Sequence, residues 1–148
     1  MCMLETLIAI WNVEFVQVTI KIFLATFIGG LIGYDRLRLG KPAGIKTHAL
    51  VCLGSCIAML VGVLSSRTYG TDPTRIGAQV VSGIGFLGAG MIIVTGENRI
   101  LGLTSAASLW FVACLGLAVG SEYTYIAVVS CVCYYIITHL VNNDKFLS

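Results

Sequence analysis

Five long apolar runs, separated by short polar segments, constrain this chain more than any other feature of its sequence. A helix that crosses the hydrocarbon core of a bilayer needs about 20 mostly apolar residues. The runs that approach this length are Phe15–Tyr34, His48–Ser65, Ile76–Thr95, Leu103–Val119 and Tyr123–Val141. Backbone polar groups inside lipid must be paired within their own segment, so the runs predict helices rather than strands. The predicted fold class is all-α, a polytopic membrane helix bundle of about five transmembrane helices.

The composition supports the same class and excludes others. Hydrophobic residues make up 57% of the chain and charged residues only 11%, whereas soluble domains carry about 25% charged residues. The predicted surroundings are therefore the lipid bilayer. The net charge of +2 and the lack of a basic stripe give no indication of a nucleic-acid partner. Because no arrangement typical of nucleophilic catalysis or of nucleotide binding is present, the sequence predicts a protein that is not an enzyme.

Orientation is predicted from the basic residues of the short loops. The segment after the first run carries Arg36, Arg38, Lys41 and Lys46 and is the most basic loop of the chain. Basic loops stay in the cytoplasm, which places the N-terminus outside and the short tail, residues 142–148, in the cytoplasm. Residues 1–14 are apolar but short and acidic, and we interpret them as an interfacial segment rather than a span.

Polar and charged side chains gather at the ends of the predicted helices. Such residues are costly near membrane depth, which makes them candidates for function. The predicted functional polar cluster consists of Asp35, Arg36, Lys46, Thr47, His48, Asp72, Arg75, Gln79, Arg99 and Thr104. Simpler interpretations stay open. Asp72 followed by Pro73 is typical of a helix start, and Lys21, inside the first run, is interpreted as extending its ammonium group to the outer surface.

A metal site is not defined by these residues. No cluster has the spacing of metal ligands, and no cofactor is predicted. Mg²⁺ is the one ion considered, because Asp35 and Asp72 each offer carboxylate oxygens to a hydrated ion. The predicted topology puts these two carboxylates on opposite faces of the bilayer, so they are not expected to share one ion.

Glycines are the other conspicuous residue type within the runs. Small residues let membrane helices approach closely. The predicted packing positions are Gly29, Gly33, Gly83, Gly85, Gly88, Gly90, Gly116 and Gly120. The string from Gly83 to Gly88 matches a dinucleotide fingerprint, but it lies inside a membrane run, which excludes that interpretation. The glycines of the third run predict either tight helix crossings or a distorted helix near a cavity, and a bundle with such faces is also expected to form a homodimer.

Four stretches of the chain resemble one known family. They are residues 29–36 (GGLIGYDR), 43–51 (AGIKTHALV), 72–90 (DPTRIGAQVVSGIGFLGAG) and 102–107 (GLTSAA) with Trp110. In these stretches the chain resembles the MgtC/SapB family of bacterial inner-membrane proteins. Two positions depart from the family pattern, since Asp35 stands where Glu is common and Lys46 where Arg is usual.

The resemblance implies a five-helix transmembrane domain over residues 15–141 in the bacterial inner membrane. It also implies a link to growth at low magnesium and to virulence, with the protein acting as a regulator of another membrane protein such as the F-type ATP synthase. The alternative function is a small transporter of Mg²⁺ or another solute. Longer relatives carry a C-terminal ACT-like domain, and this chain is expected to be a short form without it.

Overall fold

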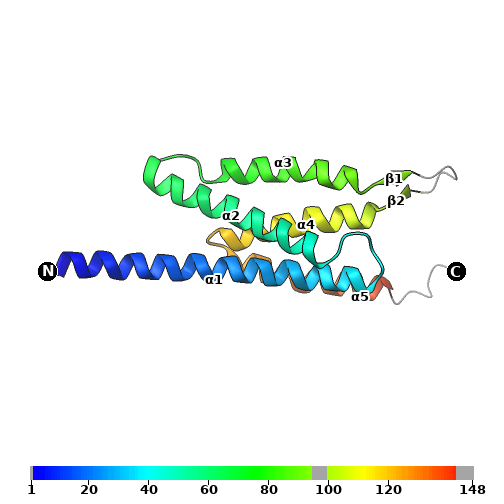
Figure 1. The fold of residues 1–148 in the computed structure, drawn as a ribbon, viewed down its shortest axis with the longest axis horizontal. Coiled ribbons are helices and arrows are strands. Elements are labelled where there is room, and N and C mark those ends of the chain that lie inside the picture. Colours follow the sequence, from blue (N-terminus) through cyan, green and yellow to red (C-terminus); the bar gives the residue numbers. More distant parts are fainter. Residues whose placement is uncertain (1, 95–99, 143–148) are drawn as a thin grey trace.

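The computed structural model describes residues 2–94 and 100–142, with side chains described within residues 13–138. Five helices follow one another, with one small hairpin between the third and the fourth (Figure 1). The helices are α1 (Cys2–Arg38), α2 (Ile45–Tyr69), α3 (Thr74–Gly90), α4 (Leu103–Gly120) and α5 (Thr124–Asn142). The hairpin pairs β1 (Ile93–Val94) with β2 (Ile100–Leu101) in antiparallel register. The prediction of an all-α bundle of five helices is confirmed.

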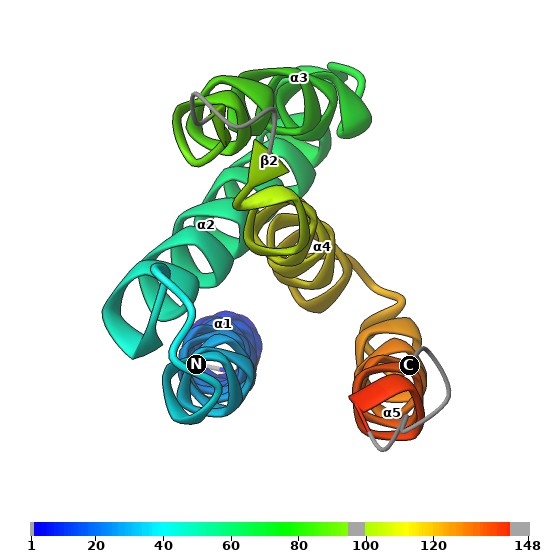
Figure 2. The same cartoon turned by 90° about the vertical axis from the view of Figure 1, so that its right-hand side faces the viewer.

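Helix α4 forms the centre of the bundle. It contacts each of the other four helices, and the end-on view shows α3 on one side of it and α5 on the other (Figure 2). Helices α1 and α2 pack against each other and against α4. The buried core between these three helices consists mainly of Ile28, Ile32, Cys52, Cys56, Val112, Leu115 and Val119.

Three helices are long and apolar enough to cross a membrane. They are α1 from Val13 to Arg38, α2 and α4. Helix α5 is also apolar, but its described apolar part, Thr124–Thr138, is shorter. Helix α3 has 17 residues, which corresponds to about 26 Å and is less than the hydrocarbon thickness of about 30 Å. The chain is therefore a multi-pass membrane protein in which α3 is the shortest helix.

The predicted bounds of the third run need correction. The run was expected to stay helical from Ile76 to Thr95, but α3 ends at Gly90 and the chain enters β1 at Ile93. Thr95 lies outside the described residues. Two physical features favour the end of the helix at Gly90. Glycine is the poorest helix former after proline, and the β-branched Ile and Val that follow suit an extended backbone.

The first helix is longer than the predicted run. Helix α1 is continuous over its 37 residues, or about 55 Å, so it extends well beyond one hydrocarbon thickness. The segment interpreted as interfacial thus continues into the span without a break. Its position relative to the lipid stays a prediction.

Close contacts at glycines hold α1 and α4 against α2. A Cβ atom at Gly29 would lie 2.7 Å from the Cβ of Cys52, and one at Gly116 would overlap the backbone oxygen of the same Cys52. Gly33 and Gly120 are equally close to the α2 backbone. A larger side chain at any of these four positions would push two helices apart, which supports a packing role for these glycines.

The glycines of α3 behave differently. Among the described residues, nothing lies within 4 Å of a Cβ built at Gly83, Gly85 or Gly90, and at Gly88 the nearest atom is the Cβ of Ala106 at an ordinary 3.7 Å. The expectation of tight crossings at these glycines is wrong for the contacts within this chain. Gly83 lines an apolar cavity between α2 and α3, but α3 is a continuous α-helix at this position.

Candidate functional site

The predicted polar residues fall into two groups at opposite ends of the bundle. Asp35 and His48 lie near the turn that joins α1 to α2, at the same end as the β1–β2 hairpin (Figure 1). Asp72 lies in the turn between α2 and α3, at the other end. The two carboxylates therefore cannot share one metal ion, as the sequence predicted. No group of three or more potential metal ligands occurs among the described residues.

At the first end, four side chains from three helices form what we call the buried polar cluster: Arg36, His48, Ser105 and Ser108. Each has less than one-tenth of its surface exposed. Nη2 of Arg36 donates to Oγ of Ser105 at 3.4 Å. Nε2 of His48 lies 3.1 Å from Oγ of Ser108. These contacts link α1 and α2 to the first two turns of α4.

The hydrogen bonds determine which ring nitrogen of His48 carries a proton. Nδ1 lies 2.9 Å from the carbonyl oxygen of Gly44, and a carbonyl can only accept, so Nδ1 is protonated. The hydroxyl of Ser108 donates to the carbonyl oxygen of Ser105 at 2.8 Å. When the His48 ring is neutral, its Nε2 can only accept. The one hydroxyl hydrogen of Ser108 therefore has two possible acceptors, Nε2 of His48 and the carbonyl oxygen of Ser105.

Arg36 is the charged member of the cluster and is only 2% exposed. Its Nε atom is buried and has no hydrogen-bond partner in the part of the chain that the structure describes. Tyr134 of α5 interacts electrostatically with both Arg36 and the neighbouring Asp35. A buried cation is costly, which marks this position as a candidate functional site.

Three of the predicted residues lie near this cluster but outside it. Lys46 and Thr47, in the first turn of α2, are exposed, and so is Thr104 in the first turn of α4. The buried hydroxyl is that of the next residue, Ser105. Arg99 lies outside the described residues.

At the opposite end, Asp72 caps the start of α3. Its Oδ1 accepts hydrogen bonds from the backbone N–H of Thr74 at 2.8 Å and from the hydroxyl of Thr74 at 2.7 Å. These two hydrogen bonds hold the pKa of Asp72 below its ordinary value, since they stabilise the charged carboxylate. The predicted helix-start role is supported, although the helix begins one residue later, with Pro73 at the N-cap position. Arg75 and Gln79 are exposed on α3.

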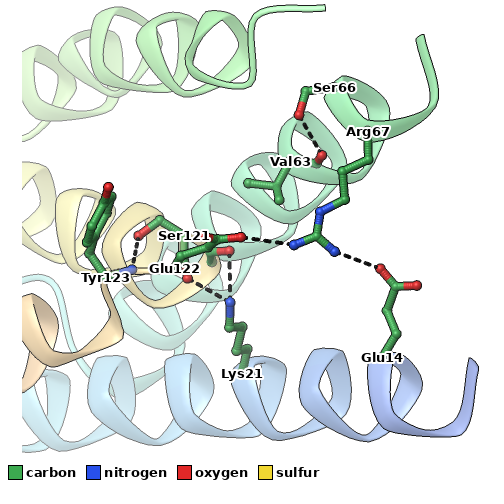
Figure 3. Close-up of polar contacts among 9 residues, drawn as sticks. Glu14, Lys21, Val63, Ser66, Arg67, Ser121, Glu122 and Tyr123 are labelled. Atoms are coloured by element: carbon green, nitrogen blue, oxygen red, sulfur yellow. Dashed lines mark hydrogen bonds and ion pairs between the residues drawn. The ribbon is translucent and has the colours of Figure 1, made fainter. Parts of the chain in front are cut away.

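The same end carries a second set of ionic contacts (Figure 3). Arg67 of α2 forms ion pairs with Glu14 of α1 at 3.2 Å and with Glu122 of the α4–α5 turn at 2.9 Å. Nζ of Lys21 donates to the backbone oxygen of Ser121 at 2.6 Å and to the backbone oxygen of Gly120 at 3.5 Å. Lys21 thus binds the C-terminal end of α4, where a cation is favoured. The ammonium group thus reaches the turn at the end of the bundle, and its position relative to the membrane surface stays a prediction.

Sequence reasoning did not place the two serines in the cluster. Ser105 and Ser108 are three residues apart, so they lie on one face of a helix, and that spacing could have paired them. No spacing in the sequence predicts the contact between Arg67 and Glu122, because this contact depends on how α2 packs beside the α4–α5 turn.

Comparison with known proteins shows which family the chain belongs to. The model of the MgtC family matches residues 22–145. The chain belongs to the MgtC family. Curated relatives include "Putative magnesium transporter YhiD" of Escherichia coli K12, which is 46% identical over 108 residues and aligns with 69% of this chain and 50% of its own length.

Two further relatives cover similar parts of the chain. Protein SapB of Bacillus subtilis is 36% identical over 72% of this chain and 49% of its own length. Protein MgtC of Brucella abortus is 43% identical over 66% of this chain and 40% of its own length. The chain spans about half the length of the curated relatives it matches. No solved structure matches it.

Proposed function

We propose that this protein is a non-enzymatic regulator that acts by binding another membrane protein. The supporting observation is the outward face of α3. Ala78, Ser82, Gly85 and Ala89 follow one another at spacings of four, three and four residues, and all are exposed. Small residues at this spacing form one stripe along a helix and allow a second helix to approach closely.

This face differs from the other glycine faces in having no partner among the described residues. At Gly29 and Gly116 the space beside the glycine is filled by α2, whereas beside Gly85 it is open. Phe86, next to the stripe, is 85% exposed. Large aromatic side chains with flanking small residues suit contact with another transmembrane helix or with lipid.

A growth experiment tests the proposal. A strain that lacks its own MgtC-family protein and depends on this chain for growth at low magnesium would receive the Gly85→Leu variant. We expect growth to be lost while the amount of folded protein in the membrane is unchanged, because leucine blocks the approach of the partner without touching this chain.

Gly30→Leu is the matched control. Gly30 also has nothing within 4 Å of a built Cβ, but it lies on α1 rather than on the stripe. The control should grow like the wild type. Equal growth of both variants at equal protein levels would contradict the role of the α3 face.

The identity of the partner is part of the proposal. The F-type ATP synthase is the candidate that the family resemblance implies, and ATP-driven proton pumping in inverted membrane vesicles is the matching measurement. Pumping should fall when the wild-type chain is present and should be restored by Gly85→Leu. We place the protein in the bacterial inner membrane with its N-terminus outside, because the turn after α1 is the most basic one.

Transport of Mg²⁺ or another solute is the second candidate. It draws on the name of the E. coli relative and on the buried position of Arg36 beside Asp35. Flux of Mg²⁺ into proteoliposomes decides between the two. The regulator account predicts the same flux as in protein-free vesicles, whereas flux that depends on Asp35 would favour the transporter.

A further inference from the structure

The contacts around His48 need more hydrogen atoms than a neutral ring can supply. Nδ1 of His48 lies 2.9 Å from the carbonyl oxygen of Gly44, and Nε2 lies 3.1 Å from Oγ of Ser108. Oγ of Ser108 in turn lies 2.8 Å from the carbonyl oxygen of Ser105. Each of these three contacts needs its own hydrogen, and a carbonyl provides none. A neutral imidazole and one hydroxyl carry only two hydrogens that can be donated, so one contact is left without a hydrogen.

A second proton on the ring completes the set. Nδ1 then donates to Gly44, Nε2 donates to Ser108, and the hydroxyl of Ser108 donates to Ser105. The carbonyl oxygen of Ser105 has two lone pairs, so it accepts this hydrogen beside its helical hydrogen bond. In the neutral state the same hydroxyl has to turn toward Nε2, which leaves the contact with Ser105 without a hydrogen. The hydrogen-bond geometry therefore suits a charged ring better than a neutral one.

Burial and one neighbouring cation oppose the charged ring. His48 is 0% exposed, and a charge that leaves water loses solvation energy. The positive charge of Arg36, on α1, acts on the ring. Helix α4 carries no acidic or basic residue, Lys46 of α2 is exposed, and Tyr134 of α5 interacts with Arg36 and Asp35. Because imidazole loses its proton near pH ~6.5 in water, these opposing effects keep both states of His48 accessible.

A cavity connects the buried polar cluster with the surface. It has a volume of about 300 Å³ and lies between the turn that follows α1, the β1–β2 hairpin and the first turn of α4. Its lining includes the exposed residues Lys41 and Thr104 and the buried Ser105. Ser105 belongs to the buried polar cluster, so the cavity reaches from the surface to the edge of that cluster. A proton from solution therefore has a short path toward His48.

We propose that His48 is a reversible proton-binding site that couples pH to the packing of α1, α2 and α4. The proton comes from solution and binds Nε2, while the hydroxyl hydrogen of Ser108 turns from Nε2 to the oxygen of Ser105. The charged ring then donates to Ser108 in a charge-assisted hydrogen bond, which strengthens the contact between α2 and α4. It also repels Arg36 of α1. This proposal does not rest on the regulatory function proposed above.

The ¹⁵N chemical shifts of the ring test the site directly. The chain has two histidines, so His139→Gln leaves His48 as the only imidazole signal. The full chain with this substitution, in detergent micelles, would be titrated from about pH 8 to about pH 5. We expect hydrogen on Nδ1 alone at the upper end and hydrogen on both nitrogens at the lower end. A ring that stays neutral throughout in the folded protein would overturn the proposal.

Ser108→Ala, in the same background, removes the acceptor for the second proton. A charge-assisted hydrogen bond is about twice as strong as a neutral one, so the ratio of charged to neutral rings at a given pH should fall about fivefold. Ser55→Ala is the matched control. Ser55 is also a serine with 4% exposure, and its hydroxyl donates to the carbonyl oxygen of Val51, one turn earlier on α2. The control should change the ratio by less than about twofold.

Arg36→Gln should act in the opposite direction. It removes the cation that opposes the charged ring, so the ratio of charged to neutral rings should rise about tenfold. A histidine that only fills space between the helices would not respond in opposite directions to these two substitutions. If Ser108→Ala changes the ratio no more than Ser55→Ala, or if Arg36→Gln lowers it, the proposal is overturned. Should a variant fail to fold, the titration of the His139→Gln protein alone decides.

Discussion

At the scale of residues, the closest contacts in this bundle occur where a side chain is missing. Gly29 and Gly116 bring α1 and α4 against the backbone of α2. The sequence predicted these two contacts because regularly spaced small residues on apolar helices indicate close packing. It did not distinguish them from Gly85, whose surroundings are open. Spacing along one helix does not reveal which face another helix covers.

Gly116→Ala tests this packing. The added Cβ would overlap the backbone oxygen of Cys52, and overpacking of this kind costs about 1–3 kcal/mol. We expect a lower midpoint of unfolding by sodium dodecyl sulfate, followed by circular dichroism. Gly30→Ala, with open space around it, should leave the midpoint unchanged or raise it. A drop of equal size in both variants would contradict the packing role of Gly116.

Thr74→Val tests the cap at the start of α3. The hydroxyl of Thr74 donates to Asp72, and its loss should raise the pKa of Asp72 toward the ordinary value. Because the folded pKa is lowered, the cap stabilises α3 at neutral pH and is lost as the pH falls through that value. Carboxyl ¹³C shifts of Asp72 in detergent micelles would give the titration. An unchanged titration would show that the hydroxyl does not act on this carboxylate.

At the scale of elements, the first, second, fourth and fifth helices follow from hydrophobic length. The end of α3 at Gly90 does not, because apolar residues continue beyond it and hydropathy alone cannot distinguish a helix from a short hairpin. The polar contacts between elements also could not be predicted from the sequence. Lys21 and Ser121 are a hundred residues apart in the chain, and nothing local in the sequence joins them.

Lys21→Met tests the contact between α1 and the end of α4. Methionine keeps most of the volume but cannot donate to the oxygen of Ser121, and we expect a loss of about 1–2 kcal/mol in unfolding free energy. Arg67→Gln removes two exposed ion pairs and should cost less than about 1 kcal/mol. Its effect should also shrink at high salt. If Arg67→Gln is the more costly substitution, the assigned roles are wrong.

At the scale of the whole molecule, the charged residues that the structure describes lie mainly towards the two ends of the bundle, with the apolar core between them. This arrangement predicts which positions face the same side of the membrane. Single cysteines at positions 41 and 122, in a background without other cysteines, should react with an impermeant thiol reagent from opposite sides. Position 41 should react from the cytoplasm, since it lies in the most basic turn. Reaction of both positions from one side would contradict the five-helix arrangement.

The central claim is that the outward face of α3 contacts another membrane protein. The most direct measurement is photo-cross-linking in living cells with benzoylphenylalanine at position 85, compared with position 30. The account predicts a product at position 85 that contains a second, different membrane polypeptide, and none at position 30. Labelling of lipid alone at both positions, or a product made only of two copies of this chain, would contradict it.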